Sequence, residues 1–178
     1  MSSPVDEIKL ALSGLIEAIE QRKNFVAVRV PADKLKEAAR RLQELGYDRL
    51  ILVTGIDEFK EKKIRVVYHF EKYEDPGRVV ALETLVPRDN PVVPSLHDLW
   101  GAAILQEREE HEMLGIRFEG HPDLRKILLP PDWPDNLYPL RKDYRVREEP
   151  FMSTKPSKPI WELKPELKPK ESEAGTKK

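Results

Sequence analysis

The chain has 178 residues, a length typical of one domain with room for a buried core. Charged residues make up 35% of it, yet the two signs nearly cancel to a formal net charge of -1. This balance disfavours a general nucleic-acid binder, which needs a basic surplus to displace counterions. The absence of cysteine excludes disulfides, thiolate metal sites, iron–sulfur ligation by this chain and cysteine nucleophiles.

The sequence also argues against a segment that enters the membrane. No apolar run approaches the roughly 18 residues needed to cross a bilayer. The N-terminus lacks the basic-then-apolar pattern of a signal peptide. We therefore expect a cytoplasmic protein that reaches a membrane only through a partner. The abundance of Lys, Glu and Arg is also typical of proteins from thermophiles.

The first third of the chain predicts two helices separated by a strand. Apolar residues recur at helical spacing over residues 6–21, which predicts an amphipathic helix. Residues 24–30 alternate in hydropathy and predict a strand. A second amphipathic helix follows from about Ala32, and Gly46 is placed to end it.

Three strands are predicted next, because apolar and β-branched residues dominate residues 49–56, 63–70 and 78–86. The sequence Glu-Asp-Pro-Gly at 74–77 is a strong turn signal, so the last two strands are expected to form an antiparallel hairpin. This order of elements predicts an α+β fold, in which a small mixed or antiparallel sheet carries its helices on one face.

The rest of the chain combines one more helix with proline-rich segments. Ser95 begins a predicted helix that ends near Met113, and prolines interrupt every later window. We predict an α+β domain over residues 1–120, an irregular docking segment over 121–149 and an extended, charged, Pro-rich tail over 150–178.

Glu107 is the most unusual residue of the predicted third helix. At 100° per residue it lies in the middle of an apolar stripe, where a carboxylate is costly unless it is paired or hydrogen-bonded. Its candidate partners within the chain are Arg108, Arg117 and Arg125. One interpretation is an internal ion pair that ties the helix to the following loop. Another is a helix face that docks on a second protein through Glu107, Glu109 and His111.

A metal site is a third interpretation of the same region. The i, i+4 spacing brings Glu107 and His111 together, and His121 is the nearest further candidate ligand. However, the chain has no His-Glu-x-x-His pattern and no clear third ligand, so a small metal-dependent enzyme is the weaker alternative. No Gly-rich phosphate loop and no nucleophile beside a base are visible in the sequence.

Residues 120–130 combine glycine and proline, which restrain the backbone, with polar groups at close intervals. His121, Asp123 and Arg125 provide these groups, while the apolar run at 127–129 requires burial. A preformed loop loses little conformational entropy on docking and therefore suits recognition of another protein. The alternative is a loop that only covers the core.

The same part of the chain contains short motifs that ordinary helix or strand formation does not require. They are Glu-Arg-Glu at 107–109, Leu-Gly-Ile at 114–116, Gly-His-Pro-Asp-Leu-Arg at 120–125, Pro-Pro-Asp-Trp at 130–133 and Pro-Leu-Arg-Lys-Asp-Tyr at 139–144. Together with upstream matches at 66–70 and 88–100, they resemble the 30 kDa subunit family of respiratory complex I, also called the C subunit of bacterial NADH:quinone oxidoreductase. The resemblance covers about residues 25–145.

The resemblance implies a non-catalytic subunit that binds no cofactor itself. Such a subunit packs against the large subunit, which carries the [NiFe] centre or its quinone-site counterpart, and lies near the small iron–sulfur subunit. We therefore expect a peripheral position on the inner face of the cell membrane, with only indirect contact to the membrane arm. The expected interface comprises Glu107, Arg108, Glu109, His111, His121, Asp123, Arg125, Trp133 and Arg141.

One departure from the complex I pattern refines this expectation. After Glu-Arg-Glu, complex I usually has an aromatic residue and then Asp, whereas this chain has His111 and Glu112 after Glu110. This variation resembles archaeal energy-converting membrane-bound [NiFe] hydrogenases, and it implies a ferredoxin-dependent hydrogenase coupled to ion translocation. A ferredoxin-dependent sulfur-reducing complex and NADH:quinone oxidoreductase itself stay open, as does a free-standing interaction module.

Overall fold

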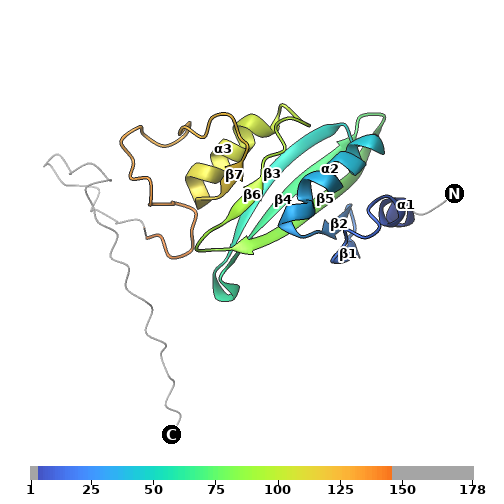
Figure 1. Ribbon diagram of the computed structural model, residues 1–178, viewed down its shortest axis with the longest axis horizontal. Helices are drawn as coiled ribbons and strands as arrows, with labels where there is room; N and C mark the ends of the chain where they lie inside the picture. Colours follow the sequence, from blue (N-terminus) through green and yellow to red (C-terminus); the bar gives the residue numbers. More distant parts are fainter. Residues whose placement is uncertain (1–3, 146–178) are drawn as a thin grey trace, which may run out of the picture.

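The computed structural model describes residues 4–145. The helices and strands are α1 (Pro4–Ala11), β1 (Ala18–Gln21), β2 (Phe25–Arg29), α2 (Leu35–Glu44), β3 (Arg49–Glu58), β4 (Lys63–Lys72), β5 (Asp75–Pro87), β6 (Val92–Pro94), α3 (Ala103–Leu114) and β7 (Arg117–Glu119). Five strands form one sheet in the order β1-β2-β5-β4-β3 (Figure 1). Because β2 and β5 run parallel and the other pairs run antiparallel, the predicted α+β class with a mixed sheet is confirmed.

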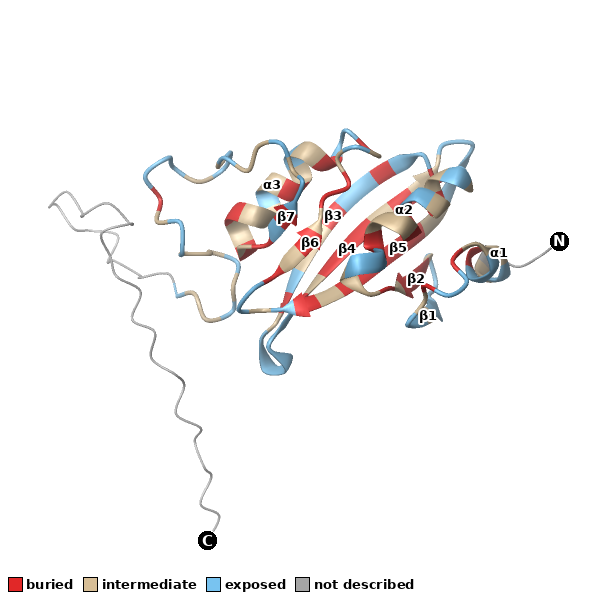
Figure 2. Ribbon diagram, viewed as in Figure 1, coloured by how far each residue is buried: buried red, intermediate tan, exposed pale blue. Residues whose placement is uncertain are grey.

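One face of this sheet forms the hydrophobic core with the helices. Alternate residues of β4, from Ile64 to Phe70, are fully buried on this face, and α2 crosses in front of it (Figures 1 and 2). Helix α3 lies on the same side, because Tyr68 of this face bonds to Glu107 of α3. On the opposite face Leu52 and Ile56 remain 48% and 42% exposed. The helices therefore cover one face, as the sequence predicts.

Helix α3 also covers the free edge of the sheet. The N–H of Val53 donates to Gln106 Oε1 at 2.6 Å, and the N–H of Gly55 bonds to Glu110. An edge strand presents unpaired backbone donors, and these two side chains satisfy donors of β3. Gly55 allows the close approach, since a Cβ at this position would lie 2.5 Å from Glu110 Oε2.

The N-terminal helix is shorter than the predicted span of residues 6–21. Helix α1 ends at Ala11, Gly14 adopts a φ of 79°, and the last part of the span forms β1 beside β2. Residues of this part that face the core, such as Ile16 and Ile19, fit a helical period and a short strand equally well. The pairing with β2 decides the conformation.

The third helix begins at Ala103 instead of Ser95. Strands β6 and β7 pair in parallel, and the N–H of Ser95 continues this pairing by donating to the carbonyl of Glu119 at 2.9 Å. The Ser95 hydroxyl contacts the Glu107 carboxylate, so it does not cap the helix. The predicted hairpin is confirmed, although its turn lies at residues 73–74, just before β5.

Gly115 ends α3 in the left-handed region with a φ of 76°, and the ring of Tyr138 packs directly against it. A Cβ at this position would lie 2.6 and 2.7 Å from two ring carbons. We expect Gly115→Ala to lower the free energy of unfolding by about 2 kcal/mol, as left-handed strain and displacement of the ring add up.

The matched control for this substitution is Gly46→Ala. Gly46 has a φ of 87°, but nothing lies within 4 Å of a Cβ built there. The control should lower the free energy of unfolding by only about 1 kcal/mol, because it adds left-handed strain without displacing a neighbouring side chain. Urea unfolding of the purified chain measures both values, and equal losses would show that the Tyr138 contact contributes nothing.

Candidate subunit interface

Glu107 lies at the centre of a buried hydrogen-bond network beneath α3. Its Oε1 accepts bonds from the Tyr68 hydroxyl at 3.0 Å and from the Leu96 N–H at 2.9 Å, and its Oε2 contacts the Ser95 hydroxyl. The residue has no exposed surface. Burial raises the pKa of Glu107, while the hydrogen bonds oppose this rise. Glu107 thus joins α3, the β4 strand and the segment after β6.

The partners of Glu107 differ from those predicted. The sequence offers Arg108, Arg117 and Arg125, but the donors are a hydroxyl pair and a backbone N–H. The reason is geometric, because the carboxylate points into the core toward β4, whereas Arg108 and Arg125 lie toward the outer segment. The ion pair to the following loop is therefore wrong for Glu107, which is anchored within the chain by hydrogen bonds to β4 and to the segment before α3.

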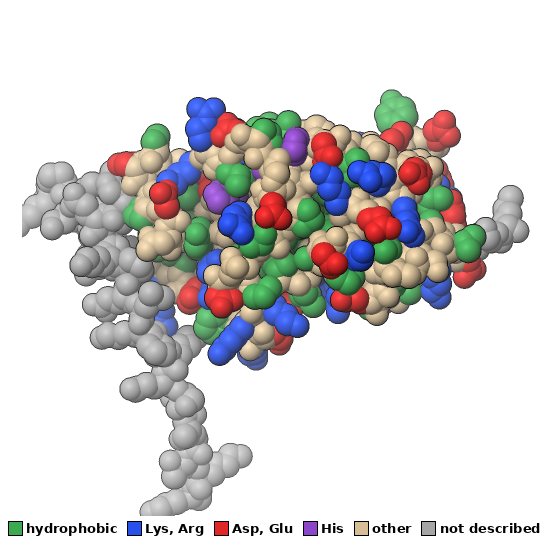
Figure 3. Space-filling view, viewed as in Figure 1, with side chains coloured by type: hydrophobic (Ala, Val, Ile, Leu, Met, Phe, Trp, Pro, Cys, Tyr) green, Lys and Arg blue, Asp and Glu red, His purple; other side chains and the backbone are tan. Residues whose placement is uncertain are grey.

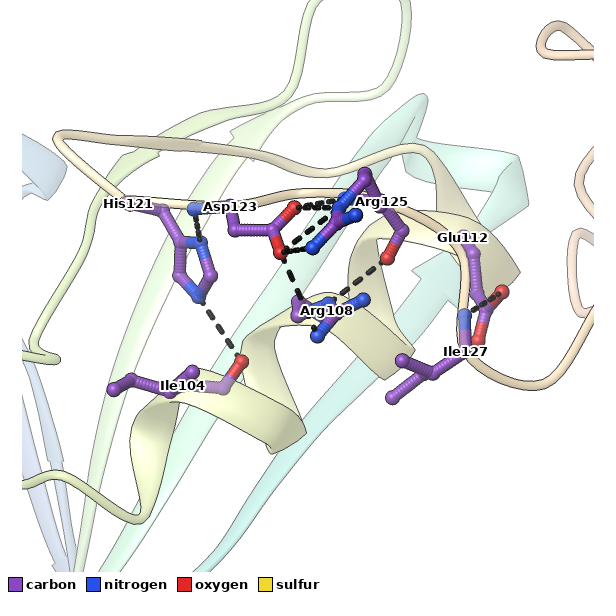
Figure 4. A network of polar contacts seen from close by, with 7 residues as sticks. All are labelled: Ile104, Arg108, Glu112, His121, Asp123, Arg125 and Ile127. Carbon is purple, nitrogen blue, oxygen red and sulfur yellow. Dashed lines mark hydrogen bonds and ion pairs between the residues drawn. The ribbon is translucent and has the colours of Figure 1, made fainter.

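The next residue of α3 holds the segment that begins at Gly120 (Figure 4). Arg108 Nε donates to the carbonyl of Arg125 at 2.9 Å, and Nη1 lies 3.9 Å from Asp123 Oδ2. Asp123 in turn accepts side-chain bonds from two nitrogens of Arg125, at 2.8 Å from Nη2 and at 3.0 and 3.1 Å from Nε. These contacts fix a loop whose outermost group, the Arg125 guanidinium, is 85% exposed.

Both ring nitrogens of His121 are engaged within the chain. Nε2 bonds to the carbonyl of Ile104 at 3.0 Å, and Nδ1 accepts the N–H of Asp123 at 3.1 Å. A carbonyl only accepts, so the hydrogen resides on Nε2. His111 similarly donates from Nδ1 to the carbonyl of Ile116 at 2.8 Å. The histidines therefore support backbone turns around α3.

These contacts bear on the metal-site interpretation. Both carboxylate oxygens of Glu107 and both nitrogens of His121 are occupied by hydrogen bonds. Across residues 4–145, no group of three or more His, Asp or Glu side chains is arranged to hold a metal ion. A site built from Glu107, His111 and His121 would have to break the network that positions α3.

Glu112 clamps the apolar run that follows the loop. Its carboxylate accepts three backbone N–H groups, from Ile127 at 3.1 Å, Leu128 at 2.8 Å and Leu129 at 3.1 Å. Glu112 is itself buried. Three consecutive N–H groups on one carboxylate form a rigid turn without secondary structure. Sequence reasoning had no signal for this clamp beyond the unusual Glu at position 112.

A second anchor holds the end of the segment against the sheet. Arg88 donates to both carboxylate oxygens of Asp57, at 2.7 and 3.0 Å, and to Asp143 at 2.5 Å. The N–H of Lys142 also donates to Asp57 at 2.8 Å. Burial alone would raise the pKa of Asp57, but the bonds from Arg88 and Lys142 outweigh it and lower the pKa. Sequence reasoning missed this anchor.

The remaining predicted interface residues lie around the same segment. Arg141 Nε donates to the carbonyl of Leu114 at 2.8 Å, and its guanidinium lies 4.4 Å from the ring centre of Tyr138. Trp133 is buried and donates from Nε1 to the carbonyl of Leu137 at 2.8 Å. Glu109 is exposed on α3. Residues 121–145 thus contain no helix or strand, yet side chains fix them along their length.

Among the titratable groups of α3, Glu110 has the pKa that is shifted furthest toward neutral pH. Burial against Gly55 is the main cause that raises its pKa to about 7, the Gly55 N–H opposes the shift, and Glu109 adds to it. In the folded chain Glu110 keeps its proton between pH 4.5 and 7, where the unfolded chain has lost it. Stability attributable to Glu110 therefore falls as pH rises through this window.

We expect Glu110→Gln to remove this dependence. From pH 5 to pH 8, the free energy of unfolding of the variant should rise relative to that of the parent by on the order of 2–3 kcal/mol. Glu74→Gln, at an exposed position in the turn before β5 and outside the groups that shift the pKa of Glu110, serves as the control and should keep the parent's slope. Urea unfolding at several pH values measures the slopes, and parallel curves for Glu110→Gln and its parent would contradict the assignment.

Charged side chains of both signs are interspersed with apolar ones over the face that carries α2 and α3 (Figure 3). This face has no basic field of the kind that nucleic-acid binding requires. The ordered segment along α3 is instead a rigid, mixed polar and apolar surface.

Comparison with known proteins places this surface within a protein family. The family model described as "Respiratory-chain NADH dehydrogenase, 30 Kd subunit" matches residues 28–150.

The chain belongs to this family. The C subunit of NADH-quinone oxidoreductase from Moorella thermoacetica is 40% identical over 149 residues, which cover 82% of this chain and 98% of that protein. Its counterpart from Chloroherpeton thalassium is 38% identical over 109 residues, which cover 61% of this chain but only 44% of that protein. The chain is thus the 30 kDa-type member of a complex-I-related respiratory complex.

Two solved structures share the fold. A chain in the structure of the membrane-bound sulfane sulfur reductase, described as an archaeal respiratory membrane complex, has a TM-score of 0.71 and 30% identity; the match covers 80% of this chain and 85% of that one. The trypsin-resistant fragment (1-134) of Nqo5 has a TM-score of 0.57 and 29% identity, and the match covers 67% of this chain and 96% of that one. None of the helices within residues 4–145 has the length and apolar character that a membrane crossing requires.

Proposed function

We propose that this chain is a non-catalytic, hydrophilic subunit that packs against the large subunit and beside the small iron–sulfur subunit of a membrane-bound complex. Iron–sulfur clusters and any [NiFe] centre belong to those partners. The observation that carries the proposal is the segment 121–145, which is irregular but fixed at Arg108, Glu112 and Asp57. A loop held in one conformation loses little entropy on docking.

The carboxylates of this region support a surface and leave little capacity for chemistry. Glu107, Glu112 and Asp57 each receive at least three hydrogen bonds from the chain itself. Arg125 and Glu109 point outward and are the polar contacts we assign to the partner. Leu128 and Leu140, 59% and 61% exposed, supply apolar contact area. Glu107 is buried and contributes indirectly, because its hydrogen bonds hold α3 in position.

The finer proposal concerns the type of complex. The pair His111 and Glu112 supports the subunit of a ferredoxin-dependent [NiFe] hydrogenase coupled to ion translocation, located on the inner face of the membrane. Two other versions have specific support. The fold match to the sulfane sulfur reductase favours a sulfur-reducing complex, and the identity to NADH-quinone oxidoreductase subunits favours that enzyme.

Affinity purification of the tagged chain from membranes of its source tests the packing role. The large and small subunits should co-purify with the native chain, and Arg125→Ala and Glu107→Gln should lower their yield. Normal yield of the whole complex with both variants would refute the assigned contacts. Recovery of the native chain alone would refute the packing role itself.

The same preparation distinguishes the three versions of the complex. A hydrogenase should contain stoichiometric nickel and evolve hydrogen from reduced ferredoxin. A preparation without nickel that reduces polysulfide supports the sulfur-reducing version. Oxidation of NADH with quinone reduction supports the third.

A further inference from the structure

A cavity of about 880 Å³ opens between α3 and the segment 121–138. The apolar part of its wall is formed by Leu124, Leu129, Trp133, Leu137 and Tyr138, and Arg125, Lys126 and Asp135 also line it. Its α3 side carries Arg108 and His111, one turn apart on the helix. The cavity is within the size range of sites that accept a ligand or a few side chains.

The acidic groups that line the cavity already have partners within the chain. Glu112 accepts three backbone N–H groups, and Asp135 is paired with Lys126 Nζ at 2.5 Å. Glu112 keeps its negative charge, but the lining still has a positive surplus, because Arg108, Arg125 and Lys126 outnumber Glu112 and Asp135.

Arg108 is less completely satisfied than these carboxylates. Among the described residues only its Nε makes a hydrogen bond, and the contact of Nη1 with Asp123 Oδ2 is 3.9 Å, longer than a hydrogen bond. Asp123 is held closely by Arg125 instead. The Arg108 side chain is only 13% exposed, so an anion that reached it would be largely shielded from water. The charge of the cavity is complementary to a carboxylate.

The apolar wall is fixed in position before any ligand arrives. Trp133 donates to the carbonyl of Leu137, Glu112 clamps Leu129, and the ring of Tyr144 lies 6.4 Å from that of Trp133. Ile127 and Leu128, whose N–H groups bond to Glu112, have 40% and 59% of their surface exposed. A fixed apolar cavity beside exposed apolar residues is the arrangement in which a partner's anchoring side chain binds most strongly.

We propose that this cavity receives a short peptide segment of another protein of the complex. The segment places an Asp or Glu carboxylate on Arg108 and a large apolar side chain against Trp133 and Leu129. The exposed apolar residues beside the cavity favour a protein segment, because a small ligand would leave them in water. The inference rests on the proposed function, since it names the contact by which the partner is held.

A photo-cross-linkable residue at position 137, in the complex purified from its source, tests this contact. Irradiation and mass spectrometry should identify a peptide of another protein of the complex that carries Asp or Glu within a few residues of a large apolar side chain. Position 10 on α1, where Leu10 is 81% exposed, is the control position and should not capture the same peptide.

The Arg108 contact is tested in the same background. Arg108→Met should lower the cross-link yield about tenfold, the share of one charge-assisted hydrogen bond, whereas Arg108→Lys should restore most of it. Arg117→Met, which removes an exposed charge on β7 outside the cavity lining, should leave the yield within about twofold of the parent's.

Three results would overturn the inference: cross-links only within this chain, including its residues 146–178; a captured peptide without a carboxylate; or an unchanged yield in Arg108→Met. Each of these leaves the co-purification intact. A native chain that recovers no other protein would instead overturn the proposed function, and the inference with it.

Discussion

Replacing Glu107 with alanine should cost about 4 kcal/mol of unfolding free energy, the largest single-residue effect that we expect in this chain. The substitution leaves the Tyr68 hydroxyl, the Ser95 hydroxyl and the Leu96 N–H without their acceptor in a site that excludes water. Each buried donor left unsatisfied costs about 1–3 kcal/mol, and the lost side-chain volume adds a cavity. Urea denaturation of the purified chain measures the loss.

Glu107→Gln provides the matched comparison, because it keeps the shape and one carbonyl acceptor. It should lose less than half as much as Glu107→Ala. Glu109→Ala, at a nearby exposed position, should change stability by less than about 0.5 kcal/mol. A loss below about 1 kcal/mol for Glu107→Ala would mean that the network does not hold α3 against β4.

The Glu107 site shows how far sequence reasoning reaches. A carboxylate on an apolar helical stripe predicts burial and a need for partners, and both are observed. The identity of the partners was not predictable, since Tyr68 lies 39 positions away along the chain and reaches Glu107 only after β4 has joined the sheet. Helical periodicity reports which side of a helix is buried, whereas long-range pairing decides what lies there.

The start of α3 illustrates a second limit. Ser95 has the residue type and spacing of a helix N-cap, but β6 pairs with β7 and the N–H of Ser95 continues that pairing. Three-residue strands such as β6 carry too little sequence pattern to be predicted, so the parallel pair was missed. In contrast, β4 and β5 are long and apolar, and their hairpin follows from composition and a turn signal.

The sequence motifs indicated where the candidate surface lies, but they did not predict all the contacts that hold it. The expected docking residues His121, Asp123 and Arg125 do lie together at one loop. Asp57 and Arg88, which anchor the other end of the segment, come from the sheet and its margin and carry no local pattern that links them to it. The predicted tail over residues 150–178 lies outside the described residues and stays a prediction.

The segment clamped by Glu112 supplies the second large expected effect. Glu112→Ala removes the acceptor of three consecutive N–H groups and should lower the free energy of locally opening residues 127–129 by about 3 kcal/mol. Because the clamp lies outside the sheet, amide hydrogen exchange should rise at least about tenfold at 127–129 and stay near the parent rate in β4. Glu112→Gln keeps one acceptor oxygen, so its exchange rates at 127–129 should lie between those of Glu112→Ala and those of the parent. Uniform exchange across the chain in Glu112→Ala would mean that the segment unfolds only together with the core, in which case its rigidity comes from the whole fold and not from this carboxylate.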